Sequence, residues 1–147
     1  MTENSNEKIL QALYKNSQIA IESIKGVIKE TNDEKMREEL NFQFEEYEKV
    51  SGKISALATD FNIEIKEPNP MKKAMLWTSI KANTFTDNST SHIAELMLKG
   101  TVMGVTELTK IKNDYKNDLA IDERIIELVN GFVSMEELFE KRLKKFL

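Results

Sequence analysis

Two places in the sequence bring together side chains that could take part in chemistry. The first is DNSTSHIAELMLKGTVMG, residues 87–104, which contains the chain's only histidine, His92, with Glu95 three residues later. The second is EELF, residues 136–139, which begins with Glu136. A Glu and a His three residues apart share one face of a helix. Helical bundles use the Glu-x-x-His spacing to hold a pair of iron or manganese ions, so the chain has to be searched for a metal centre.

His92 does not fit such a centre well. The inward line of its predicted helix consists of apolar or small residues three or four apart, Ile93, Met97, Gly100, Gly104, Leu108 and Ile111. His92 falls on the flank of that line and Glu95 points nearly the other way. We interpret His92 as a partly exposed residue near a helix start, with a role as metal ligand or proton-exchanging group as the alternative. One histidine and no cysteine disfavour a dinuclear site.

Glu136 is the best-supported inward carboxylate. It lies on the apolar face of the last predicted helix, and Phe139 stands three residues later, where the metal motif has histidine. A buried carboxylate needs a partner or becomes protonated. Polar residues on the inward faces of two other helices could supply hydrogen bonds, namely Ser17, Gln43 and Tyr47. We therefore predict that these three residues and Glu136 form a structural polar layer.

A metal or small-ligand pocket is the alternative for the same region. It would use Glu136 with Glu107, which lies near the inward side of its helix, and His92. Iron or manganese would then be bound by carboxylates. Under the leading interpretation no cofactor is expected. Enzymatic activity stays uncertain, and a non-catalytic role is favoured.

Gly100 and Gly104 lie on one face of a helix, where a glycine costs up to about 1 kcal/mol relative to alanine. Two of them on one face indicate that another backbone approaches closely, although a chance pair in a loosely packed helix is the alternative. The same helix has a second apolar line, Leu98, Val102 and Val105. That line predicts a second partner, either the segment around Trp77 or another subunit.

The elements that must position these residues are four long amphipathic helices. Apolar residues alternate by three and four over about 5–29, 33–62, 89–113 and 122–147. Asp33 is a plausible helix cap, and Asn62 stands where a helix would end in a left-handed residue. EIKEPNP is then an extended linker, and a short helix over residues 71–83 bears Trp77. Thr84 to Ser91 favours caps and turns.

This pattern predicts an all-α fold in a single domain, residues 1–147. The fold class is an antiparallel four-helix bundle with a long crossover that contains a short extra helix. The net charge of −4 argues against a general nucleic-acid binder. No apolar run approaches the length of a membrane span, and the N-terminus has no signal-peptide core, so no membrane association and a cytoplasmic location are expected.

Three stretches resemble a group of uncharacterised small bacterial proteins of the ferritin-like superfamily. They are WTSIKANTFTDNSTSHIAELMLKGTVMGVTELTK, the preceding EEYEKVSGKISALATDFN before PNPM, and EELFEKRLKKFL at the end. The resemblance covers most of the chain. It implies an antiparallel ferritin-like bundle, often dimeric, in a cytoplasmic protein of unassigned function. At the superfamily's di-iron motif Glu-x-x-His this chain keeps the Glu, as Glu136, but has Phe139 in place of His. The corresponding motif on the second helix is replaced by Tyr47-x-x-Val50. These departures put ferroxidase, peroxidase and iron-storage activity in doubt.

The leading functional hypothesis is a non-catalytic ferritin-like helical bundle that binds a protein or a small ligand. We expect a homodimer formed through the third long helix or Trp77. The rival hypothesis is a carboxylate-bridged di-iron or di-manganese protein with oxidoreductase or metal-handling activity. Metal content per chain distinguishes the two.

Overall fold

The computed structural model describes residues 4–147, and in this part of the chain the fold is all-α, with five helices and no strand. None of the five is long and apolar enough to span a membrane. In chain order they are α1 (Ser5–Ile28), α2 (Glu34–Asp60), α3 (Pro70–Thr86), α4 (Thr90–Tyr115) and α5 (Glu123–Lys144). The four long helices start and end within about three residues of the predicted positions, the C-terminal end of α5 included.

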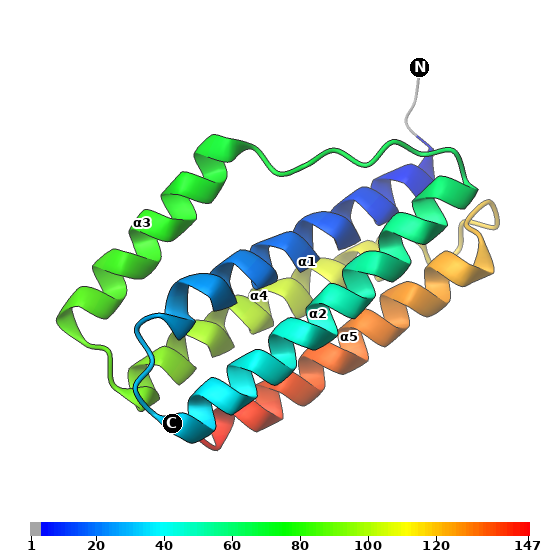
Figure 1. Ribbon diagram of the computed structural model, residues 1–147. Helices are drawn as coiled ribbons and strands as arrows, with labels where there is room; N and C mark the ends of the chain where they lie inside the picture. Colours follow the sequence, from blue (N-terminus) through cyan, green and yellow to red (C-terminus); the bar gives the residue numbers. More distant parts are fainter. Residues whose placement is uncertain (1–3) are drawn as a thin grey trace.

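The four long helices lie side by side, and α3 stands outside them, next to α1 (Figure 1). α1 and α5 run in one direction, and α2 and α4 run in the other. The segment 61–69 and α3 together carry the chain back along the bundle from the end of α2 to the start of α4. This crossover is the reason that α2 and α4 are parallel while neighbouring helices are antiparallel.

Side-chain caps define where the helices begin. An oxygen of the residue before each helix accepts a hydrogen bond from a backbone N–H of its first turn; these residues are Asn4, Asp33, Asn69, Ser89 and Asp122. Such a cap stabilises a helix by about 1 kcal/mol. At the other end of α2, Asn62 has φ 55°, so the predicted left-handed residue after this helix is confirmed.

The predicted inward faces form the core. Leu10, Leu13, Leu40, Ile54, Ile93, Leu108, Ile125 and Leu143 are all 0% exposed. Three aromatic rings fill the middle of the bundle: Tyr47 lies 6.0 Å from Phe132 and 5.4 Å from Phe139, centroid to centroid. The position where a di-metal bundle would have histidine is therefore occupied by an aromatic ring in close packing.

α3 is longer than the sequence predicted. It begins at Pro70, whose fixed φ suits a first helical turn, and it continues through Thr86 rather than stopping at Asn83. Thr84 was expected in a turn but is buried within the helix, where its hydroxyl donates to the carbonyl of Ile80 at 2.9 Å. The hydroxyl is thus satisfied without leaving helical geometry, which explains the wrong boundary.

α3 packs on α1. A Cβ on Gly26 of α1 would lie only 3.0 Å from Cδ1 of Ile80, so the two helices approach closely here. One turn away, the indole N–H of Trp77 donates to Glu22 at 3.1 Å. The Trp77 segment therefore does not serve as the second partner of α4. Val102, on the second apolar line of α4, is 43% exposed, and another subunit stays the predicted partner for it.

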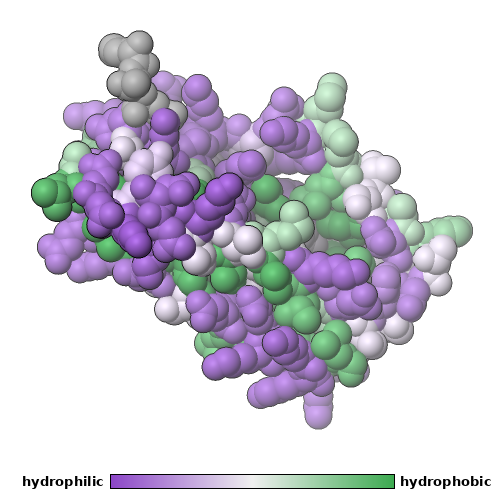
Figure 2. Space-filling view, turned by 180° about the vertical axis from the view of Figure 1, so that it is seen from behind, coloured by the Kyte–Doolittle hydropathy of each residue, from purple (hydrophilic) through white to green (hydrophobic). Residues whose placement is uncertain are grey.

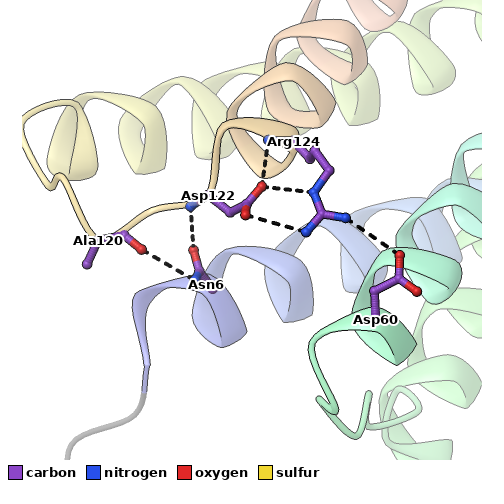
Figure 3. Close-up of polar contacts among 5 residues, drawn as sticks. All are labelled: Asn6, Asp60, Ala120, Asp122 and Arg124. Carbon is purple, nitrogen blue, oxygen red and sulfur yellow. Dashed lines mark hydrogen bonds and ion pairs between the residues drawn. The ribbon is translucent and has the colours of Figure 1, made fainter.

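One end of the bundle is held together by polar contacts (Figure 3). Asn6 at the start of α1 donates to the carbonyl of Ala120 at 3.4 Å and accepts from the backbone N–H of Asp122 at 3.1 Å. Asp122 in turn pairs with the guanidinium of Arg124 at 3.1 Å. The same guanidinium lies 3.7 Å from the carboxylate of Asp60 at the end of α2. These contacts fix the α4–α5 connection against α1 and α2.

Candidate functional site

Glu136 lies in the middle of the bundle with its carboxylate enclosed. Its side chain comes from α5 and is only 3% exposed. The phenol of Tyr47 on α2 donates to Oε2 at 2.8 Å, and Oε1 has no hydrogen-bond partner among the described residues. A buried carboxylate oxygen without a partner is costly, so this oxygen calls for an explanation.

Gly104 on α4 makes room for the carboxylate. A Cβ at this position would lie 2.8 Å from Oε1 and 2.9 Å from Oε2 of Glu136, closer than side chains pack. The two glycines of α4 were predicted to admit another backbone. At Gly104 the space is taken by a carboxylate instead, and Gly100 is exposed with nothing within 4 Å of an added Cβ. The glycines thus serve the surroundings of Glu136 rather than a close helix contact.

The environment favours the neutral form of Glu136. Burial raises its pKa to about 8; the hydrogen bond from Tyr47 lowers it, and the charges of Glu140 and Glu107 raise it. Burial also raises the pKa of Tyr47 well above its usual value, with further contributions from the charge and hydrogen bond of Glu136. At neutral pH the pair therefore consists of a carboxylic acid and a phenol.

A hollow of about 70 Å³ reaches this pair from the surface between α1 and α4. Asn16 and Ser23 of α1 line one side, Gly100 and Thr101 of α4 line the other, and Glu136 with Tyr47 lies at the far end. A space of this size exceeds what a single water molecule needs. Tyr47 and Glu136, 2% and 3% exposed, thus lie at the buried end of a small hollow that opens to solvent.

The predicted polar layer is only partly formed. Tyr47 contacts Glu136, but Ser17 donates to the carbonyl of Tyr14 at 2.7 Å. The amide of Gln43 donates to Glu39 at 2.9 Å. All of these side chains are buried as predicted, but only Tyr47 hydrogen-bonds to Glu136. Ser17 and Gln43 therefore belong to other contacts and do not bond to Glu136.

Glu39 forms the centre of a second polar cluster. It is 8% exposed and accepts from Nε of Arg142 at 2.8 Å and 3.0 Å, so it links α2 to α5. The guanidinium of Arg142 also lies 4.4 Å from the ring of Phe42. The sequence reasoning missed this ion pair, although Glu39 and Arg142 flank the inward faces of their helices.

The three residues proposed as metal ligands, Glu136, Glu107 and His92, do not form a cluster among the described residues. Glu107 is exposed on α4, although its charge influences Glu136. His92 lies about 18 Å along α4 from Gly104. Its Nε2 is 3.1 Å from the carbonyl oxygen of Asn83. Within residues 4–147, no group of three or more His, Cys, Asp or Glu side chains could hold a metal ion. His92 is partly exposed near a helix start, as interpreted from the sequence.

A larger groove, which the sequence did not suggest, lies between α1 and the crossover. Its volume is about 430 Å³, and it is bounded by α1 from Gln11 to Glu22 and by residues 66–76. Four lysines surround it: Lys15, Lys66, Lys72 and Lys73. In Figure 2, hydrophobic residues are visible among hydrophilic ones on the side of the molecule that carries α3.

Specific hydrogen bonds hold the crossover at the edge of this groove. The side-chain amide of Gln11 donates to the carbonyl of Lys66 at 2.9 Å and accepts from its N–H at 2.8 Å. The phenol of Tyr14 donates to Glu67 at 2.7 Å, and burial together with Glu67 raises the pKa of Tyr14 to about 12. The linker is therefore fixed to α1 on one side of the groove, and Ile80 fixes α3 on the other.

Comparisons with protein-family models, curated proteins and solved structures found no match. The resemblance to ferritin-like proteins thus stays a prediction. The features of the molecule that bear on its function are the groove, the hollow above Glu136 and the charged side chains around them.

Proposed function

We propose that this protein is a non-catalytic ferritin-like helical bundle that binds a small amphipathic organic anion, such as a medium-chain carboxylate, in the groove between α1 and the crossover. The observation that carries the proposal is the combination of an apolar groove of about 430 Å³ with four lysines around it. A ligand with an apolar body and one acidic group would match both features.

The groove has the dimensions of a small-molecule site. Pockets for such ligands measure roughly 300–1,000 Å³ and are mostly apolar with a few polar groups. Here the apolar surface comes from side chains that include Ile19, Pro68 and Leu76. An alkyl chain lying along this surface would be removed from water, which stabilises binding by about 25 cal/mol per Å² of apolar area buried.

The charges at the groove favour an anion. Within the described residues, none of the four lysine ammonium groups lies within 4 Å of a carboxylate. The two acidic residues of the groove, by contrast, have partners: Glu67 accepts from Tyr14, and Glu22 accepts from Trp77. The positive charges are thus left to attract a ligand, while the negative ones are engaged within the protein.

Two further features support a ferritin-like bundle without metal chemistry. The long crossover joins two parallel helices, α2 and α4, which is the connection expected of a ferritin-like fold. The centre of the bundle has Phe139 where the di-metal motif has histidine, and residues 4–147 contain no cluster of three metal-binding side chains. Binding without catalysis is therefore preferred to the iron or manganese alternative.

Titration of the protein with decanoate, followed by isothermal calorimetry, tests the proposal. We expect saturable binding that is weakened by the double substitution Lys15→Ala and Lys72→Ala, which removes one ammonium group from each side of the groove. Exposed ion pairs contribute about 0.2–1 kcal/mol each, so the double variant should bind roughly 2- to 30-fold more weakly.

The matched control is Lys49→Ala with Lys99→Ala, which removes the same charge from α2 and α4. These lysines pair with Glu46 and Glu95, and they do not line the groove. Equal weakening in the two double variants would show only a general effect of net charge. That result, or the absence of decanoate binding to the unaltered protein, would contradict the proposal.

A further inference from the structure

We propose that the hollow between α1 and α4 is a second, separate binding site, for ammonium or a short primary amine, with the Glu136 carboxylate as the counter-ion of the bound cation. This site does not depend on the α1–crossover groove. It is assigned from the geometry around Glu136 and from the kinds of atoms that line the hollow.

The hollow ends at a carboxylate oxygen that has no partner among the described residues. Glu136 is 3% exposed, and its Oε1 has no hydrogen-bond partner in the part of the chain described, although the hollow ends at this residue. Gly104 lets α4 lie directly against this carboxylate, since a Cβ there would lie 2.8 Å from Oε1. Gly100 has nothing within 4 Å of an added Cβ, so the entrance to the hollow stays open. The hollow is therefore open at Gly100 and closes at Glu136, whose Oε1 is covered by its neighbours and lacks a donor.

Two polar side chains that line the hollow have oxygens that can still accept a hydrogen bond. Thr101 uses its hydroxyl proton to bind the carbonyl of Met97 at 2.9 Å, so its oxygen is left to accept. Asn16 uses its side-chain N–H₂ to bind the carbonyl of Ala12 at 2.9 Å, so its carbonyl oxygen is also left to accept. Together with Oε1 of Glu136, these atoms call for a ligand with several N–H donors. An ammonium group has three or four of them and no acceptor.

The charges around the hollow also favour a cation. The ionisable groups that face Glu136 are Tyr47 from α2, Glu107 from α4 and Glu140 from α5. α1 contributes only neutral side chains to the hollow, Asn16 and Ser23 among its polar ones. No lysine, arginine or histidine lines the hollow. A cation that entered would therefore meet only neutral or acidic groups.

The volume restricts the ligand to a small one. About 70 Å³ is available, which is enough for ammonium or methylammonium and too small for a long or branched amine. Ile19 and Met97 supply apolar contact beside the polar atoms. A methyl or ethyl group on the nitrogen would lie against these side chains.

Binding should be linked to proton release. Burial raises the pKa of Glu136 to about 8, so below that pH the cation has to displace a proton from the carboxyl group. The affinity should consequently rise about tenfold for each pH unit between pH 6 and pH 7.5 and level off above pH 8. A neutral ligand that accepts a hydrogen bond from the protonated acid would show the opposite trend.

The experiment is a titration with methylammonium chloride at pH 8.5, monitored by the backbone amide resonances of Gly100, Thr101 and Gly104. We expect saturable shifts at these residues, a loss of affinity of at least tenfold in Glu136→Gln, and no loss in the matched control Glu137→Gln, which alters an exposed residue beside it. Tetramethylammonium, a larger cation that has no N–H group, should not compete.

A second variant keeps the test independent of the folding of Glu136→Gln. Gly100→Leu places a side chain at the entrance, where an added Cβ meets nothing within 4 Å, so we expect a folded protein with blocked methylammonium binding. No saturable shift in the unaltered protein, equal binding of tetramethylammonium, or unchanged affinity in both Gly100→Leu and folded Glu136→Gln would each overturn the proposal.

Discussion

Gly104 of α4 and Glu136 of α5 are complementary: a Cβ atom at position 104 would lie 2.8 Å from Oε1 of the glutamate. Because the carboxyl group occupies the space that any other side chain would need, a larger residue at position 104 requires the end of Glu136 to move. The other glycine of the same helix, Gly100, has open space around it. Comparison of substitutions at Gly100 and Gly104 therefore separates the effect of a glycine on helix stability from its effect on packing.

Gly104→Ala should be less stable than Gly100→Ala. Both substitutions add helix propensity worth up to about 1 kcal/mol, which Gly100→Ala should show as a gain in the free energy of unfolding. In Gly104→Ala the added methyl group displaces a buried, hydrogen-bonded carboxyl group, and overpacking of this kind costs about 1–3 kcal/mol. Urea denaturation measures both; equal stability of the two variants would show that Glu136 moves aside freely.

Tyr47→Phe should destabilise the protein because it removes the donor to Oε2 of Glu136. A buried polar group left without a partner costs about 1–3 kcal/mol. The matched control is Tyr14→Phe, which removes the hydrogen bond to Glu67, an exposed residue that water can solvate. If thermal or urea denaturation shows equal losses for the two variants, burial of the Glu136 carboxyl group contributes little to the effect.

The stability of the unaltered protein should fall as the pH rises, relative to Glu136→Gln. The pKa of Glu136 is raised from 4.5 to about 8 in the folded state, so the folded protein binds this proton more tightly than the unfolded chain does. The contribution is full below about pH 4.5, and it is lost progressively up to about pH 8, at up to about 1.4 kcal/mol per pH unit. Urea denaturation of both proteins at several pH values checks it; a constant difference would contradict the prediction.

Arg142→Ala should cost about 1–3 kcal/mol: it removes the cation of Glu39, which is 8% exposed, but the arginine itself is 37% exposed and Gln43 still donates to the carboxylate. The matched control is Lys49→Ala, which breaks an exposed pair with Glu46 at 3.2 Å and should change the free energy of unfolding by less than about 1 kcal/mol. Chemical denaturation distinguishes the two. A small effect of Arg142→Ala would mean that water reaches Glu39 once the arginine is removed.

The helices could be predicted because their signals are local. Caps such as Asp33 and the three–four spacing of apolar residues fixed the ends of the long helices, and Asn62 has the positive φ expected after α2. The end of α3 was wrong because Thr84 resembles a turn residue but bonds within the helix. The threonine type alone does not distinguish a turn from a helix in which the hydroxyl bonds to the carbonyl four residues earlier.

The site was predicted only in part, for a geometric reason. Periodicity gives the face of a helix on which a residue lies, and by that criterion Ser17, Gln43, Tyr47 and Glu136 are all buried. It does not give the level of one helix relative to another. Of the three other residues, only Tyr47 hydrogen-bonds to Glu136. The groove was missed because it depends on where the linker lies. Two hydrogen bonds between the side-chain amide of Gln11 and the backbone of Lys66, one donated and one accepted by Gln11, hold the linker there.

The crossover divides the chain into two helical hairpins, α1 with α2 and α4 with α5, each formed by neighbours in sequence. Contacts that are local in sequence form early in folding, whereas the hydrogen bond from Tyr47 to Glu136 joins residues 89 positions apart. We expect that bond to form only when the hairpins dock, after the rate-limiting barrier. Loss of the phenol hydroxyl should then accelerate unfolding and leave the refolding rate nearly unchanged in stopped-flow measurements.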